Sequence, residues 1–177
     1  FRNIGERSPK IPFTIPLVNC PMTGWEHDNG NVEASFRLWL ETRDNGTVPN
    51  FPNLAKVGSF AGIAATGVGI RIDDAESGNI MPLNAMGNDN TVYQIPAESN
   101  GIVNVDLIAY YVSTVVPSEI TPGEADAIVN VTLDYRQYVR ALSDLSDNAL
   151  FLPLSRCIRL KNNYVKTNIR GDINLVV

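Results

Sequence analysis

Residues 125–135 read ADAIVNVTLDY, and every second position of this stretch is apolar or aromatic. Side chains of a β-strand point alternately to the two faces of a sheet, so a period of two predicts one buried and one exposed face. The stretch contains neither proline nor glycine, which would weaken a strand interior. It therefore predicts a long, half-buried strand.

Similar stripes recur along the rest of the chain, separated by turn residues such as those of Asp44–Gly46. The further candidate strands are residues 11–17, 32–40, 68–72, 80–83, 92–95 and 103–111. Seven to nine short strands at this spacing predict an all-β fold, an immunoglobulin-like sandwich with Greek-key connections. Pro12 and Pro16 share the outward face of the first stripe and cannot donate ladder bonds, so that strand should have an edge or a break there.

Composition limits what the chain can be. Its 177 residues are 44% hydrophobic, enough for one domain with its own core and no structural metal. The formal net charge is −5 and no cluster of Lys and Arg stands out, so a nucleic-acid partner is not expected. We find neither a membrane-spanning apolar run nor the apolar core of a signal peptide.

No set of residues suggests catalysis, a metal site or a cofactor. His27 is the only histidine and lies in a loop-like stretch, which favours an exposed histidine over a catalytic one. Asp73, Asp74 and Glu76 lack the spacing of a calcium loop, so a solvated turn is expected there. The two cysteines form no CxxC pair, and spacing alone allows either two thiols or one disulfide.

Four segments, in order, resemble the subunits of chaperone–usher, type 1-like pili. They are FTIPLVNCP (residues 13–21), ATGVGIRIDDAESGNIMPL (65–83), VNVDLIAYYV (103–112) and PGEADAIVNVTLDYR (122–136). The resemblance implies a pilin-type sandwich that lacks its last strand and so carries a groove. A periplasmic chaperone fills this groove first, and an extension of the next subunit replaces it in the fibre.

The resemblance also implies particular residues. One disulfide is expected between Cys20, which matches the family's second-strand cysteine, and Cys157. The expected groove-lining residues are Phe13, Ile15, Leu17, Val103, Val105, Leu107, Val129, Val131, Leu133 and Tyr135. The expected face of the donor strand is Val165, Thr167, Ile169, Gly171, Ile173 and Leu175, with the glycine at a narrow pocket.

The order of segments departs from the family pattern. A family member would end near Tyr135, whereas about forty further residues follow here, with a cysteine and a donor-like stripe. The chain is circularly permuted, supplies its own donor strand, or is naturally extended. We expect a sandwich core in residues 1–136, and a linker plus completing strand or strands in residues 137–177.

These features predict a structural, non-enzymatic subunit of a bacterial adhesive pilus, exported through the periplasm to cell-surface fimbriae. The partners implied are neighbouring pilus subunits, a periplasmic chaperone, an outer-membrane usher and a host receptor. The alternative is a pilin-like tip adhesin that binds a host glycan or protein through Trp25, His27 and Trp39. A sandwich protein that resembles pilins by pattern alone is a third possibility.

Overall fold

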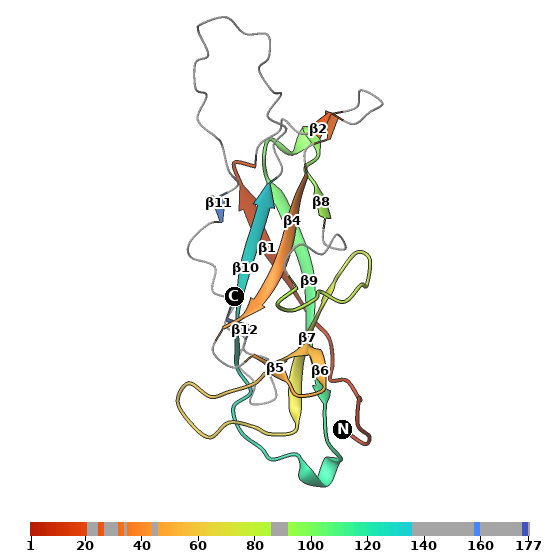
Figure 1. Cartoon of the computed structure of the whole chain (residues 1–177), viewed down its shortest axis with the longest axis vertical. Helices are drawn as coiled ribbons and strands as arrows, with labels where there is room; N and C mark the ends of the chain where they lie inside the picture. Colours follow the sequence, from red (N-terminus) through yellow and green to blue (C-terminus); the bar gives the residue numbers. More distant parts are fainter. Residues whose placement is uncertain are drawn as a thin grey trace, which may run out of the picture.

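Two β-sheets packed face to face dominate the computed structural model (Figure 1). The structure describes residues 1–20, 25–26, 32–33, 35–43, 46–85, 92–135, 158–159 and 175–176. In the described part of the chain the only helices are two short 3₁₀ turns, η2 (Ala97–Ser99) and η3 (Pro117–Glu119). The predicted all-β class is confirmed.

The larger sheet has six strands in the order β11-β1-β9-β7-β6-β5. Their bounds are Ile158–Arg159, Ile11–Val18, Val103–Ser113, Val68–Asp74, Phe51–Lys56 and Thr47–Val48. The smaller sheet has the order β12-β10-β4-β8, with bounds Leu175–Val176, Ala127–Tyr135, Ser35–Thr42 and Val92–Gln94. A separate ribbon pairs β2 (Trp25–Glu26) with β3 (Val32–Glu33).

The core lies between the two sheets and is built by the alternating stripes. In β1, Phe13, Ile15 and Leu17 are buried, and the intervening positions point outward. The inward residues of β4, β7, β9 and the first half of β10 join the same cluster. Burying apolar surface on one face of each strand fixes the register, because a slip of one residue would turn every apolar side chain to solvent.

The prolines of the first stripe do not break the strand. β1 runs without interruption through Pro12 and Pro16 and pairs with β9 from Ile11 to Leu17. On its other side, within the described residues, it pairs only at Leu17 and Val18, with β11. The prolines therefore mark an edge, which needs no complete row of donors.

The expected strand at residues 80–83 is wrong. Ile80 and Leu83 make only isolated bridges, to Asp73 and Leu40 respectively. Each end of this segment contacts a different sheet, so the chain crosses between the layers here and cannot join one ladder. Met81 is still buried, and its N–H donates to the carbonyl of Ile72 at 2.9 Å.

Candidate groove between two edge strands

Each sheet ends in a strand that is only partly paired. β10 pairs with β4 from Val129 to Tyr135. On its other side, within the described residues, it pairs only at Ala127 and Ile128, with β12. β10 therefore resembles β1, whose outer side is paired only at its last two positions.

These two edges lie on the same side of the sandwich. In Figure 1, β11, β1 and β9 of the larger sheet follow one another from left to right, as do β10, β4 and β8 of the smaller sheet, and the arrows of β1 and β10 both point upward. Unpaired N–H and C=O groups on such strands accept a further strand. The two edges thus flank a candidate groove along the core.

The groove exposes apolar side chains. Val129 is 1% exposed, whereas Val131 and Leu133 farther along the same face of β10 are only partly buried against the core. Ile11 at the start of β1 is also partly buried. These are the apolar side chains that a further strand along the two edges would cover.

A small hollow opens where β10 begins. It has a volume of about 40 Å³, and it is lined by Thr42, Gly46, Ala55, Lys56, Phe60, Ala127 and Ile128. Ala127 and Ile128 are also the two residues that pair with β12. The hollow thus lies between the start of β10 and the β6 side of the larger sheet, and no residue of β1 lines it.

One buried tyrosine joins β9 to the segment that leads into β10. Tyr111 of β9 donates its hydroxyl hydrogen to the carbonyl of Ala125 at 2.9 Å. Burial, and then the nearby charge of Asp126, raise the pKa of Tyr111 above its usual range. The phenol stays neutral and remains a donor over the whole physiological range.

The structure describes the expected groove-lining residues but only one residue of the expected donor face. The β1 and β9 members of the groove set are buried in the core beside the groove: Phe13, Ile15, Leu17, Val103, Val105 and Leu107. Of the donor face, only Leu175 is described, and it pairs with Ala127 in parallel orientation. Val165, Thr167, Ile169, Gly171 and Ile173 lie outside the described residues, as does Cys157. The assignment of these roles stays a prediction.

Cys20 lies at the end of β1 and is 3% exposed. Its N–H donates to the carbonyl of Gly101 at 2.9 Å, which fixes the backbone there. Ile158, the residue directly after Cys157 in sequence, pairs with Val18. The pairing partner of Ile158 is thus two residues before Cys20 in the sequence.

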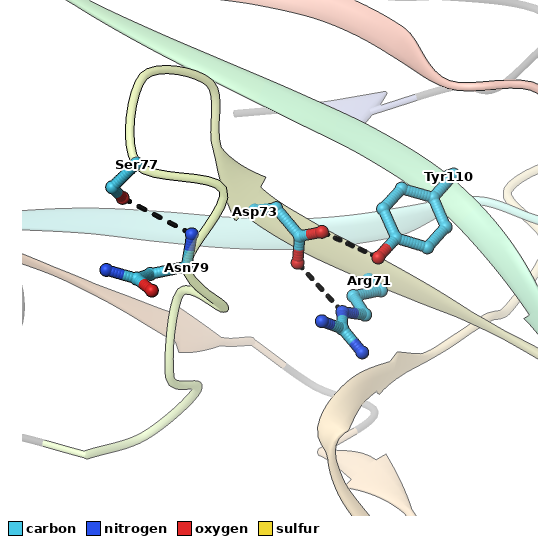
Figure 2. Close-up of polar contacts among 5 residues, drawn as sticks. All are labelled: Arg71, Asp73, Ser77, Asn79 and Tyr110. Atoms are coloured by element: carbon cyan, nitrogen blue, oxygen red, sulfur yellow. Dashed lines mark hydrogen bonds and ion pairs between the residues drawn. The ribbon is translucent and has the colours of Figure 1, made fainter.

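The expectation of a solvated turn at Asp73 and Asp74 is wrong. Both belong to β7 and are 3% and 9% exposed. Figure 2 shows Asp73 between Tyr110 and Arg71: the Tyr110 hydroxyl donates to Oδ2 at 2.6 Å, and Arg71 Nε donates to Oδ1 at 2.8 Å. Buried carboxylates need such partners, and a sequence pattern of local turn residues does not reveal them.

Asp74 faces the opposite side of β7. It accepts hydrogen bonds from the Ser77 N–H and hydroxyl, both at 2.7 Å, and from the Tyr93 hydroxyl at 2.8 Å. Burial alone would raise the pKa of Asp74, but these hydrogen bonds outweigh it and hold the pKa below its usual value. The turn begins after the two aspartates, and the hydrogen bonds of Asp74 to Ser77 hold it. Ser77 also accepts a hydrogen bond from the Asn79 N–H at 3.2 Å (Figure 2).

The residues considered for a receptor site receive no support. Trp39 is 6% exposed on β4, so its ring does not form an open platform. His27 lies outside the described residues, and so does the side chain of Trp25. Among the described residues no group of three His, Cys, Asp or Glu side chains could hold a metal ion, and no helix is long and apolar enough to cross a membrane.

Two facing sheets around one apolar core define an immunoglobulin-like sandwich. The family model for fimbrial proteins matches residues 1–136 of the chain. A type-1 fimbrial protein subunit of Serratia marcescens is 30% identical over 139 residues, covering 77% of this chain and 68% of the relative. The chain belongs to the fimbrial protein family.

Solved structures agree on the fold. The P pilus rod subunit PapA is similar over 75% of this chain and 82% of its own, with a TM-score of 0.55 and 21% identity. A chain from the structure of a chaperone–usher pilus is similar over 75% of this chain and 72% of its own, with a TM-score of 0.54 and 20% identity. The predicted pilin-type sandwich is confirmed, and the possibility of an unrelated sandwich protein is wrong.

Membership of the fimbrial protein family establishes the general function of the chain. The protein is a structural subunit of a pilus, exported through the periplasm to cell-surface fimbriae, where it contacts other pilus subunits.

Proposed function

We propose that the subunit is joined into its adhesive fibre by strand addition at the groove between β1 and β10. The observation that carries this proposal is the pair of open edges on one side of an apolar core. An added strand would satisfy the backbone groups of both edges and cover Val131 and Leu133.

We further propose that, before assembly into the fibre, residues 165–175 occupy this groove as a strand of the same chain, and that a neighbouring subunit's strand then takes their place. Support comes from the places where the C-terminal region is paired: β11 lies at the end of β1, and β12 lies at the start of β10. Because β1 and β10 run in the same direction, these are opposite ends of the groove (Figure 1). In this proposal the segment between them, residues 160–174, passes from one end to the other.

The length of this segment is sufficient. From Arg159 to Leu175 an extended chain reaches at most about 53–58 Å, whereas a nine-residue strand such as β10 spans roughly 30 Å. The proposed segment descends from Arg159 and must then reverse its direction, because Leu175 pairs with Ala127 in parallel orientation. The extra length leaves room for this reversal. The competing arrangement places the same stripe in the groove of a neighbouring subunit.

We propose that Cys20 and Cys157 form a disulfide that fastens the first residues of this returning segment. The pairing of Val18 with Ile158 supports it, because it brings the chain next to Cys157 within two residues of Cys20. Residues 1–136 would then be the sandwich core, and residues 137–177 a linker followed by completing strands.

A chaperone of the periplasm and an outer-membrane usher are the partners that this assembly route requires, and we propose both. We also propose a purely structural role without catalysis, which the structural character of the fimbrial family supports. A host receptor is the remaining expected partner, and among the described residues no surface favours one.

A pair of substitutions tests the donor strand. Ile169→Arg places a charge on the proposed inserted face, and Asn168→Arg places the same charge on the other face. We expect Ile169→Arg to lower the unfolding free energy of the intact chain by about 3–5 kcal/mol, because the charge would be buried without a partner. Equal, small effects of the two variants on thermal unfolding would refute the assigned face.

A further inference from the structure

The outer face of the six-stranded sheet carries a cationic cluster that the groove does not use. Three cations surround the ring of Tyr110: Arg7 and Lys10 lie 5.5 Å from its centroid, and Arg71 lies 5.8 Å from it. Tyr110 is fully buried although its strand face points away from the core. The stems of the long basic side chains cover its ring and leave their charged ends at the surface.

The positive charge of the cluster exceeds the negative charge of the carboxylate that is joined to it. Asp73 is the only carboxylate joined to it among the described contacts, through Arg71 Nε and the Tyr110 hydroxyl. Three cations and one carboxylate leave a charge of +2. Distances of 5.5–5.8 Å from one centroid mean that any two cations are within about 11 Å of each other, close to the Debye length at physiological salt.

The rest of the chain has the opposite sign. The whole chain has a formal charge of −5, so the residues outside this +2 cluster together carry −7. Beside the cations on the same sheet face lies a small apolar group: Leu54 and Val112 are buried with Tyr110, and Val48, Phe51 and Ile108 are partly exposed. A compact apolar centre with a charged rim is the usual composition of a protein–protein contact.

We propose that this face docks a second copy of the same subunit, through exposed carboxylates of the copy on Arg7, Lys10 and Arg71. Charge complementarity favours this occupant, because the residues of a second copy outside its own cluster together carry −7. The face lies on β7 and β9, which are central strands of their sheet. It is therefore available after the groove is filled, and the contact is lateral and separate from strand addition.

The experiment measures weak self-association of the purified full chain by sedimentation at low and at high salt. We expect reversible association at about 0.05 M salt that is largely lost at about 1 M, where screening acts within roughly 3 Å. Arg7→Glu/Lys10→Glu should weaken association about three- to tenfold, and Arg7→Gln/Lys10→Gln, which keep most of each stem, should weaken it less. Lys10→Glu alone should also weaken association, and Arg2→Glu is its control, because it makes the same charge change in the same exposed N-terminal segment.

The outcomes separate the possibilities. Species linked by strand addition would persist at high salt and on dilution, so they are not mistaken for this contact. Absence of salt-sensitive association, or an equal loss with Arg2→Glu and Lys10→Glu, would overturn the proposal. Binding of the cluster to heparin or to anionic lipid vesicles, with no self-association, would also overturn it in favour of a foreign anionic partner.

Discussion

The hydroxyl of Tyr110 donates a 2.6 Å hydrogen bond to Oδ2 of Asp73, and both side chains are buried on the outer face of the six-stranded sheet. Burial and then this hydrogen bond raise the pKa of Tyr110 to about 12. Because the neutral phenol is favoured in the folded state, its contribution is complete below the unfolded pKa of about 10 and is lost as the pH rises toward 12.

Alkaline unfolding should therefore depend on this residue. The wild-type chain should lose about 2 kcal/mol through Tyr110 between roughly pH 10 and pH 12, and Tyr110→Phe should remove that part of the slope. At neutral pH the variant should be less stable by about 1–2 kcal/mol, since Asp73 loses a donor. Urea titrations at several pH values measure both effects; an unchanged alkaline slope would contradict the assignment.

Asp74 gives the opposite dependence on pH. Its lowered pKa means that its contribution is present above the usual carboxyl pKa of about 4 and is lost as the pH falls through the folded value. Asp74→Asn should flatten the acid limb of the stability profile and cost about 1–3 kcal/mol at neutral pH. Glu76→Gln, an exposed carboxylate in the same turn, is the matched control and should leave the profile nearly unchanged.

Gly123 should tolerate no side chain. A Cβ at this position would lie 2.5 Å from both the Ala65 nitrogen and the Ile63 oxygen, which are backbone atoms and cannot rotate away. We expect Gly123→Ala to lower the unfolding free energy by about 2 kcal/mol or more. Gly62→Ala is the comparison, because its Cβ would meet only side-chain atoms, those of Glu124 at 3.2 Å and of Ser59 at 3.8 Å. If the two variants melt alike, the close approach of these loops is wrong.

The proposed disulfide is directly measurable. Non-reducing peptide mapping should recover one peptide that joins Cys20 to Cys157. Cross-linking so distant a pair should stabilise the chain by roughly 4–5 kcal/mol in the chain-entropy picture, so Cys157→Ser should melt well below the wild-type chain. Two alkylatable thiols in the folded, oxidised protein would rule the bond out.

The sequence allows most of the sandwich to be predicted because each core strand carries its own period-two stripe. β1, β7, β9 and β10 were found in this way, and the outward prolines of β1 indicated an edge. The alternating pattern could not predict contacts between residues that are far apart in the sequence. Asp73 and Asp74 looked like turn residues, and only Tyr110 and Tyr93, which lie on other strands, make their burial possible.

The same reasoning explains the missed outer cluster. Tyr110 falls on the outward positions of its strand, where exposure is expected, and it is buried because Arg7 and Lys10 cover it from a segment one hundred residues earlier. The pairing of Ile158 with Val18 and of Leu175 with Ala127 could not be predicted either, because an alternating apolar pattern does not indicate which edge strand it pairs with.

Strand addition by the C-terminal stripe is tested most directly by thermal unfolding of the intact chain against a chain truncated after residue 160. The truncated chain should aggregate, or melt at least about 15 °C lower, and a peptide of residues 161–177 should restore its stability. The same peptide with Ile169→Arg should fail to do so. A truncated chain that melts like the intact one, with no response to the peptide, would contradict the account.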